Sequence, residues 1–339
     1  MATESSLTDV PQSWYLMCRS RELGRGRIVS REILGHQLAI FRAQSGAVTA
    51  MDARCAHMGA HLGRGDVVGD RIRCALHHWT CDAAGVCRSP NGTTWRPQTI
   101  YPTIERHGAI FMFAGPEPRF DLPSLAQPDE SPLRVMAGAT RAIETTWGSI
   151  VTNAFDIGHM QAVHARALRE DPALMLLGSD GLQMRYVSRV TGAGLSDRVM
   201  RWLSDDAIRA TISCWGGTVV IVRSQVGMLD TRLMLCVTPT TTGVDVTPFF
   251  GVLRTSAGAI DAAAIRVTRW LFTAFLSRDL VPLHGMRLRI DGALATPGPL
   301  SWATRWLLTL PAASFTSADD SPTASVQRGV VSGSSRTQL

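Results

Sequence analysis

Two short segments of the chain carry its most specific pattern: residues 55–63, CAHMGAHLG, and residues 74–79, CALHHW. Each supplies one Cys and one His, in the order C-x-H and then C-x-x-H. A structural zinc site is the simpler alternative, but zinc fingers place two Cys in one arm and two His in the other. The alternating order instead favours a two-iron cluster, in which one iron takes both thiolates and the other takes both imidazoles. The four ligands that this pattern predicts are Cys55, His57, Cys74 and His77.

The surrounding sequence predicts a β-scaffold that brings the two segments together. Short apolar runs alternate with turns rich in Gly, Asp and Asn, which is typical of an all-β domain. Gly residues within and around both segments leave backbone N–H groups free to approach a sulfur. The strands expected on this basis cover residues 37–41, 47–51, 71–75 and 109–113.

Because they carry both motifs, residues 14–115 resemble the Rieske family, whose domains bind a [2Fe–2S] cluster. The resemblance implies that Cys55, His57, Cys74 and His77 hold the cluster. The family usually has Gly after its second His ligand, where this chain has His78. We expect this departure to alter packing or solvent access beside the cluster without removing a ligand. His61 matches a position that is often His but is not a ligand.

The remaining cysteines are not predicted to form a disulfide framework. The chain has seven Cys, an odd number, and its polar N-terminus does not look like a secretion signal. We therefore expect Cys81 and Cys87, which follow the second segment closely, to be core or turn residues.

A second cluster of chemistry-bearing residues reads N-x-x-D-x-x-H-x-x-x-x-H, from Asn153 through Asp156 and His159 to His164. Asp156 and His159 are three apart and share a helical face. The two His are five apart, so the helix must end or bulge near residues 161–164. Two His and one carboxylate form the facial triad of non-haem Fe(II) oxygenases. Taken alone, the pair would favour core histidines with satisfied hydrogen bonds.

In a chain that also carries the first motif, however, this run is similar to the mononuclear-iron motif of the Rieske oxygenase family. The resemblance implies a third ligand, an Asp on a later helix, for which Asp261, Asp279 and Asp291 are candidates. Asp279 is favoured because a lone carboxylate in an apolar helical segment needs a partner, although an ion pair with a nearby Arg would also supply one. Asp261 suits a helix N-cap and Asp291 a turn. We expect His284 to support the site or to be structural.

The chain as a whole is predicted to be α+β, with an all-β domain followed by a helix-on-antiparallel-sheet domain of helix-grip type. Helical spacing covers residues 147–169 and 258–290, and alternating β-like stretches lie between 183 and 253. The predicted divisions are a Rieske domain at 14–115, a Pro-rich connection at 116–139, a catalytic domain at 140–312 and a disordered tail at 313–339.

Composition excludes several classes of protein. The 339 residues are 45% hydrophobic and 18% charged, which fits neither a disordered nor a fibrous chain. The net charge is +6, every basic residue is Arg, and these are spread along the chain, so a nucleic-acid-binding arm is not expected. A diffuse positive surface would steer an acidic protein partner instead. Without a long apolar run, we expect a cytoplasmic protein that does not span a membrane.

The resemblance implies a terminal oxygenase of the α type. Electrons from NAD(P)H would arrive through a separate flavin reductase, directly or by way of a ferredoxin, and pass from the cluster to an Fe(II) held by His159, His164 and Asp279. That iron would use O₂ to hydroxylate or oxidatively demethylate an apolar aromatic or polycyclic substrate, steroid-like compounds included. Asn153 and Asp156 are predicted to be catalytic, with Asp156 accepting hydrogen bonds from His159 and from the partner subunit's His77.

At this length the chain is closer to the homotrimeric class of dicamba and vanillate demethylases and 3-ketosteroid hydroxylases. The sequence leaves two other classes of protein open. One is a Rieske-type electron-transfer protein, which would need only the first motif, and the other is an inactive scaffold that kept the fold. Hydroxylation, demethylation and desaturation are equally compatible with the residues named.

Overall fold

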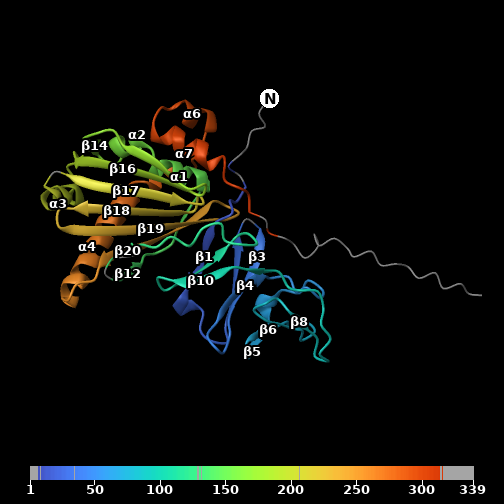
Figure 1. Cartoon of the computed structure of the whole chain (residues 1–339). Coiled ribbons are helices and arrows are strands. Elements are labelled where there is room, and N and C mark those ends of the chain that lie inside the picture. The colour runs from blue at the N-terminus through green and yellow to red at the C-terminus, as the bar shows by residue number, and fades with distance from the viewer. Residues whose placement is uncertain are drawn as a thin grey trace, which may run out of the picture.

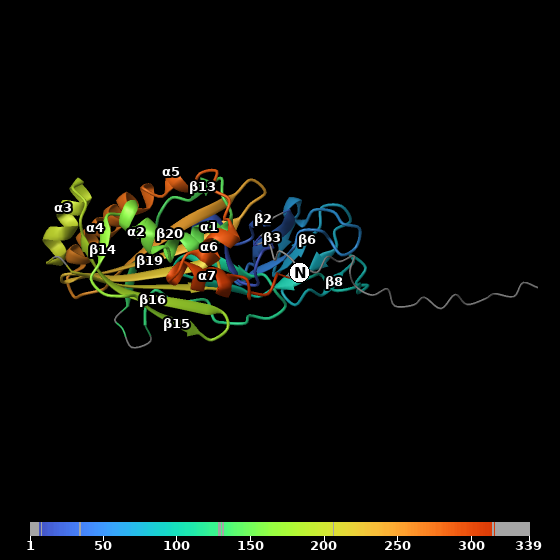
Figure 2. The same ribbon diagram turned by 90° about the horizontal axis from the view of Figure 1, so that it is seen from above.

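The structure, a computed structural model, describes residues 7, 9–33, 35–127, 130, 132–205, 207–313 and 315. It has an N-terminal group of small β-sheets and a C-terminal group in which helices pack on one large sheet (Figure 1). Seen from above, the two groups lie end to end and give the molecule an elongated outline (Figure 2). The predicted α+β class, with an all-β part followed by helices on an antiparallel sheet, is confirmed.

The N-terminal group contains three antiparallel sheets, in the orders β1-β11-β10, β2-β3-β4-β9 and β5-β6-β7-β8. The cluster segments predicted from the sequence lie in the loops after β4 and after β6, so the scaffold presents them side by side. The strands are β1 (Trp14–Arg19), β2 (Ile28–Ile33), β3 (His36–Arg42), β4 (Val48–Asp52), β5 (Asp66–Val68), β6 (Arg71–Arg73), β7 (Thr80–Cys81), β8 (Cys87–Arg88), β9 (Ile100–Tyr101), β10 (Thr103–Arg106) and β11 (Ala109–Phe113).

The C-terminal sheet has nine strands, with the path β12-β20-β19-β18-β17-β16-β14; β13 also pairs with β20 and β15 with β16. All of these pairs are antiparallel. The strands are β12 (Leu133–Ala137), β13 (Arg141–Ile143), β14 (Arg166–Leu168), β15 (Ala173–Leu177), β16 (Gly181–Val190), β17 (Ile208–Trp215), β18 (Val219–Val226), β19 (Leu229–Pro239) and β20 (Val244–Leu253).

Helices cover one face of this sheet, and α4 runs across β19 and β20 (Figure 1). The sequence predicted helical spacing over 147–169 with an end or bulge near residues 161–164. The structure does end α2 at Ala162 and continues into β14, but it also breaks the pattern earlier, between α1 and α2. The break occurs because Asp156 caps the second helix, accepting a hydrogen bond from the backbone N–H of His159. The helices are α1 (Trp147–Ala154), α2 (Ile157–Ala162), α3 (Leu195–Ser204), α4 (Gly258–Ser277), α5 (Leu280–Leu283), α6 (Ile290–Ala295) and α7 (Pro299–Leu307), with short 3-10 helices η1 (Ser20–Glu22) and η2 (Leu62–Arg64).

The large sheet is buried on both faces where the two groups meet. Trp14 and Phe113 of the N-terminal group pack with Ile221 and Phe249 of the large sheet in one apolar cluster. The opposite face of the same strands packs under α1 and α4. Burial on both sides explains why the segment 219–222 is apolar without alternation. It also joins the two groups through a shared core.

Some sequence predictions lie outside these elements or differ from them. The predicted tail at 313–339 falls outside the described residues except at 313 and 315. No helix among the described residues is long and apolar enough to cross a membrane. Several large apolar residues of the C-terminal group are exposed, namely Met175, Leu176, Trp202 and Trp270.

Candidate metal sites and their cavity

The two cluster loops are built on the same plan. In each, the Cys backbone N–H donates to the carbonyl five residues later, from Cys55 to Ala60 and from Cys74 to Trp79. The residue four positions after each Cys donates back to the Cys carbonyl. That residue has a positive φ in both loops, +72° at Gly59 and +56° at His78. The repeated turn aims one Cys and one His from each loop towards the same region.

Burial separates the thiols from the imidazoles. Cys55 and Cys74 are 4% and 2% exposed, whereas His57 is half-buried and His77 is exposed. Burial raises the pKa of the Cys55 thiol, and the adjoining Cys74 raises it further. The ring centroids of His57 and His77 lie 5.1 Å apart. A two-iron cluster with both thiolates on the inner iron and both imidazoles on the outer iron fits this division.

Neighbouring side chains hold the first loop in place. The indole of Trp79 stacks on His57 with centroids 4.6 Å apart, and Trp95 meets the same ring edge-on at 6.4 Å. The side chain of the buried Gln98 accepts a hydrogen bond from the backbone N–H of Ala56 and donates to the backbone carbonyls of Asp52 and Arg54. Sequence reasoning missed Gln98, because nothing in its local pattern distinguishes it from a surface residue.

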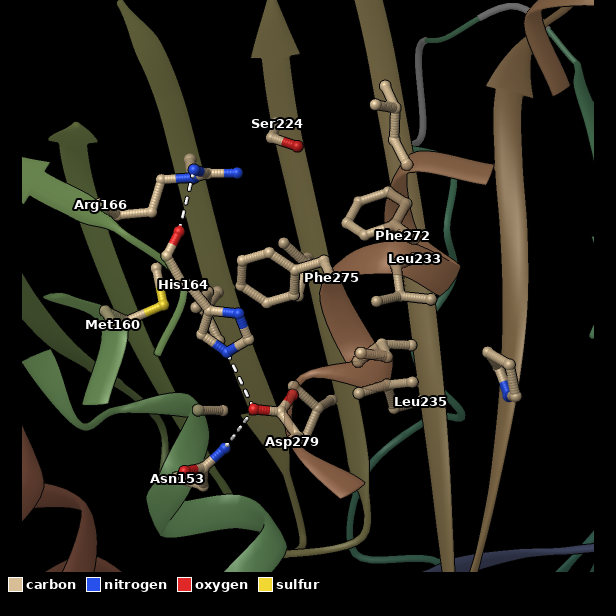
Figure 3. A pocket seen from close by; sticks show the side chains of 18 of the residues that line it. Asn153, Met160, His164, Arg166, Ser224, Leu233, Leu235, Phe272, Phe275 and Asp279 are labelled. Atoms are coloured by element: carbon tan, nitrogen blue, oxygen red, sulfur yellow. Dashed lines mark hydrogen bonds and ion pairs between the residues drawn. The ribbon is translucent and has the colours of Figure 1, made fainter. Parts of the chain in front are cut away.

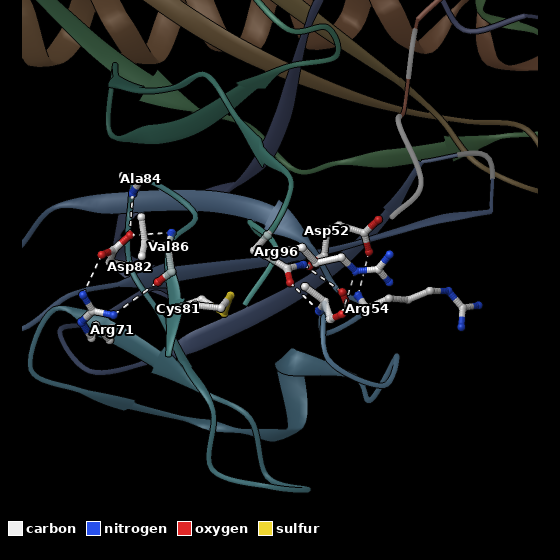
Figure 4. The surroundings of a disulfide bond; sticks show 11 residues. Asp52, Arg54, Arg71, Cys81, Asp82, Ala84, Val86 and Arg96 are labelled. Atoms are coloured by element: carbon white, nitrogen blue, oxygen red, sulfur yellow. Dashed lines mark hydrogen bonds and ion pairs between the residues drawn. A yellow bond between two sulfur atoms is a disulfide. The ribbon is translucent and has the colours of Figure 1, made fainter. Parts of the chain in front are cut away.

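A disulfide that the sequence did not predict closes the β7–β8 hairpin beside the second loop. Cys81 and Cys87 are cross-strand partners and are bonded to each other (Figure 4). The prediction that both are core residues is confirmed, but the expectation that they form no disulfide is wrong. An odd total count hid the pair, because the other five cysteines are free. An ion pair between Arg71 and Asp82, 2.7 Å apart, lies beside the hairpin.

The second site brings together residues from α2, the loop after it and the α4–α5 junction. Oδ1 of Asp279 lies 2.7 Å from Nε2 of His159 and 2.8 Å from Nε2 of His164, and the two nitrogens are 3.1 Å apart. Among the described residues these three form the single group of His, Cys, Asp or Glu that could share one metal ion. Three ligands about 2.1 Å from an ion and at right angles would be about 3 Å apart, so the spacing fits a facial triad.

The protonation states also suit metal ligation. Burial lowers the pKa of His164 despite the neighbouring carboxylate, which keeps the imidazole neutral. Burial raises the pKa of Asp279, but the hydrogen bonds from His159 and His164 outweigh this effect and lower that pKa below its ordinary value. Neutral imidazoles and an ionised carboxylate are the forms that bind a metal ion. The residues present thus fit a mononuclear iron.

The triad is oriented by packing as well as by polar contacts. The His164 ring stacks on Phe275 with centroids 3.6 Å apart, and its Nδ1 has no hydrogen-bond partner among the described residues. Asn153 donates to Asp279 at 3.5 Å, and Arg166 donates to the carbonyl of His164 at 3.0 Å (Figure 3). Phe275 and Arg166 were missed from the sequence because only the fold brings them to the triad.

Other predicted site residues lie elsewhere. Asp261 is buried in the first turn of α4, where it accepts from the backbone and hydroxyl of Thr255, and Asp291 is exposed beside Arg289. Arg278, one alternative partner of Asp279, pairs with Asp197 instead. The expectation that His284 supports the site is not met, because its side chain is 68% exposed and faces Glu144.

An apolar cavity of about 170 Å³ opens from the triad into the space between the helices and the large sheet. His164, Asp279 and Asn153 are part of its wall. Figure 3 shows Phe272, Phe275 and Leu233 along the same space, above Asp279. A reactive centre at Asp279 would therefore act on an apolar molecule enclosed by protein.

The Rieske [2Fe-2S] domain model matches residues 13–99. Residues 13–99 are therefore a Rieske domain. Cholesterol 7-desaturase from Bombyx mori is 31% identical over 48% of the chain, and the match spans only 37% of that protein's own length. The oxygenase component of 3-ketosteroid-9-alpha-monooxygenase from Rhodococcus rhodochrous is 24% identical over 88% of the chain and 83% of its own length.

The fold of the whole chain has a counterpart in dicamba monooxygenase. The crystal structure with bound dicamba superposes with a TM-score of 0.60 at 20% identity, over 88% of this chain and 97% of that one. The Rieske domain thus continues into the large sheet and its helices as in that enzyme. The predicted family resemblance is confirmed by the domain match, the relatives and the shared fold.

Proposed function

We propose that the chain is the terminal oxygenase component of a multicomponent Rieske oxygenase. It uses O₂ and electrons from a separate reductase to hydroxylate or oxidatively demethylate an apolar aromatic or polycyclic substrate, steroid-like compounds included. The observation that carries this proposal is the His159–His164–Asp279 triad in the wall of an enclosed apolar cavity. A pure electron carrier would need neither the triad nor the cavity, so that alternative is not favoured.

The chain's own residues divide the work. When bound, the cluster supplies single electrons and the mononuclear iron supplies open coordination positions for O₂. His159, His164 and Asp279 hold the iron, and Asn153 steadies the carboxylate through its side-chain N–H. The apolar wall, with Phe275 against His164, excludes water and orients the substrate.

Three observations support a homotrimer in which the cluster of one subunit serves the iron of the next. Figure 1 shows the cluster hairpins around β5, β6 and β8 well away from α2 and α4 within one chain. Exposed apolar side chains, Met58, Leu76 and Trp95, surround the cluster histidines. Asp156 is half-buried and next to the triad, with Oδ1 on the backbone N–H of His159. A head-to-tail ring would bring Asp156 to the partner subunit's His77.

Asp156→Asn tests this relay, because the amide keeps an oxygen acceptor for the backbone N–H of His159. Both metals should remain bound, and electron transfer from the reduced cluster should slow in single-turnover measurements. An active monomer, or an unchanged rate in the variant trimer, would contradict the relay. The remaining partners proposed are a ferredoxin, a flavin reductase, or both, and the cytoplasmic location stays a prediction.

The function itself is tested by loading the full chain with iron anaerobically and adding a generic NAD(P)H-linked reductase. O₂ uptake is then measured against a panel of aromatic and polycyclic substrates. We expect iron beyond the two ions of the cluster, and O₂ uptake that matches oxidised product. Full iron occupancy with no product from any substrate would favour an inactive scaffold, and cluster iron alone would favour an electron carrier.

A further inference from the structure

The cavity contains a buried hydroxyl group that the protein leaves without a partner. Ser188 of β16 is 1% exposed and lines the cavity, yet its Oγ has no hydrogen-bond partner among the described residues. Burying a hydroxyl without a partner is unfavourable, and most buried polar side-chain atoms are hydrogen-bonded. A buried serine of this kind in a ligand cavity is explained if the ligand supplies the partner.

A second hydroxyl lies next to it. Tyr186 precedes Ser188 by two residues on the same strand, so both side chains point to the same face of the sheet. It also lines the cavity, and its hydroxyl makes no hydrogen bond within the described part of the chain. Burial raises the pKa of Tyr186 to about 12, so the phenol stays protonated and can donate.

The neighbouring hydroxyls on this face are already satisfied. Across the sheet from Tyr186, through Ala210, lie Ser224 and then Thr231. The Thr231 hydroxyl donates to the carbonyl of Ser224, so the 2.8 Å contact between the two hydroxyls must use the Ser224 proton. Because neither has a proton left, the hydroxyls that remain free to donate at this end of the cavity, among the described residues, are those of Ser188 and Tyr186.

This polar end lies away from the metal triad. Figure 3 shows Ser224 at one end of the space and Asp279 at the other, with Phe275 between them and Leu235 near the level of Asp279. Thr231 and Leu235 are four residues apart on β19, which corresponds to about 13 Å along a strand. The walls between are apolar. A bound molecule can therefore have its polar group at one end and its reacting carbon at the other.

The charged groups near the polar end already pair with one another. Arg166 is buried beside it, but its guanidinium already donates to Asp197, to two backbone carbonyls and to the sulfur of Met200. Asp197 also accepts from Arg278 at 2.7 Å. Both Nη atoms of Arg166 donate within the protein, and Nη1 is paired with Asp197, whereas the hydroxyl of Ser188 has no partner among the described residues.

We infer that Ser188, with Tyr186 beside it, binds one neutral oxygen group, a carbonyl or a hydroxyl, at the end of an elongated and otherwise apolar substrate. Ser188 and Tyr186, together called the anchor, fix the direction of the substrate, so that its opposite end lies at the triad. The second statement rests on the proposed oxygenase function, whereas binding at the anchor does not. The substrate class is thus an uncharged molecule of two or more rings with an oxygen group at one end.

Three probes with the same apolar body test the inference: biphenyl, 4-phenylphenol and biphenyl-4-carboxylate. Their binding to the full-length protein, with its metals, is measured by calorimetry under anaerobic conditions, so no turnover is needed. Because one hydrogen bond to a buried hydroxyl contributes modestly, we expect 4-phenylphenol to bind about tenfold more tightly than biphenyl. In Ser188→Ala this preference should fall to about threefold or less, while biphenyl binding should not change.

Two further variants keep the test specific. Tyr186→Phe removes only the hydroxyl and should reduce the same preference. Ser213→Ala is the matched control, since Ser213 is also buried but lies on β17 at a position that points away from the cavity. Equal affinity for biphenyl and 4-phenylphenol in the unmodified protein would overturn the inference. The inference would also be overturned if Ser188→Ala and Ser213→Ala reduced the preference for 4-phenylphenol equally. Tightest binding of biphenyl-4-carboxylate, or no binding of any of the three probes, would overturn it as well.

A turnover arm separates this inference from the proposed function. With reductase and O₂, 4-phenylphenol should be oxidised on the ring far from its hydroxyl, and Ser188→Ala should give mixed products. If 4-phenylphenol binds more tightly than biphenyl but no oxidised product forms, the oxygenase function is contradicted and the binding role of Ser188 is supported. If oxidised product forms but 4-phenylphenol binds no more tightly than biphenyl, the binding role of Ser188 is contradicted and the oxygenase function is supported.

Discussion

Asp279 Oδ1 lies 2.7 Å from His159 Nε2, although 120 residues of chain separate the two side chains. The contact joins the α4–α5 junction to α2 and completes a pocket wall that neither segment could form alone. A buried carboxylate whose oxygen converges with two imidazole nitrogens would be an unusual way to stabilise a fold, because burial of the carboxylate is itself unfavourable. The arrangement is better explained as a ligand set.

Asp279→Ala should remove the mononuclear iron and leave the cluster intact. Turnover should fall by at least about 100-fold, since even a residue that only supports a metal ligand contributes 10- to 100-fold. Iron content and the visible spectrum of the cluster measure the two sites separately. Asp291→Ala, which changes an exposed carboxylate, is the control and should alter neither. Cys74→Ser should give the reverse result, with loss of the cluster spectrum.

Normal turnover in Asp279→Ala would rule out this carboxylate as the third ligand. A normal cluster spectrum in Cys74→Ser would rule out the assignment of the first site. Cys214→Ser provides a matched control for the second change, because Cys214 is also a buried free cysteine but lies in the large sheet.

Thiol counting tests the disulfide that the sequence did not predict. With the cluster removed and the chain unfolded, five thiols should react before reduction and seven after it. The bond closes a loop with a separation of six residues, which in the chain-entropy description stabilises the fold by about 2 kcal/mol. The double change Cys81→Ser with Cys87→Ser should lower the free energy of unfolding by that amount. Seven reactive thiols without reductant would contradict the bond.

How far the sequence could predict this molecule depended on whether the information was local. The cluster loops were predictable because Cys55 and His57, and then Cys74 and His77, sit within a few residues of each other and lie between recognisable strands. The disulfide was not, since only the register of β7 against β8 sets Cys81 opposite Cys87. The fold class followed from the change in periodicity near residue 140.

At the cavity the limit of prediction was the same. Asp279 was favoured from the sequence because a carboxylate in an apolar helical stretch needs a partner, and its partners then depended on tertiary packing. Phe275 and Ser188 carried no local signal, because one reads as an apolar helix residue and the other as a polar strand residue. Their roles come from the packing of α4 across β19 and β20 and from the place of β16 in the same sheet, which no periodicity encodes.

His107 should make stability depend on pH. Burial lowers its pKa to about 4, and its Nε2 accepts from the backbone N–H of Leu125 at 3.5 Å. Between about pH 6.5 and pH 4 the unfolded chain binds a proton that the folded chain does not, so the free energy of unfolding falls as the pH falls. The full contribution is at most about 3 kcal/mol. Urea unfolding at several pH values measures it.

His107→Asn should flatten that dependence, since Asn does not titrate and tolerates the positive φ of +55° at this position. His284→Asn is the control, because His284 is largely exposed and its ion pair with Glu144 is long, at 3.9 Å. A slope unchanged by His107→Asn would show that another group is responsible.

His78→Gly should stabilise the Rieske domain. His78 has a φ of +56°, and the equivalent position of the first loop is Gly59, with a φ of +72°. A left-handed conformation costs a residue with a side chain about 1–2 kcal/mol, and Gly avoids most of this cost. His78 is exposed, so little packing is lost, and we expect the free energy of unfolding to rise by about 1 kcal/mol.

The converse change, Gly85→Ala, should destabilise the domain, because Gly85 has a φ of +78° and a Cβ there would lie 2.4 Å from the carbonyl oxygen of Gln98. Thermal unfolding monitored at the cluster absorption compares the three proteins. A less stable His78→Gly variant would mean that the imidazole makes a contribution larger than the strain of its backbone.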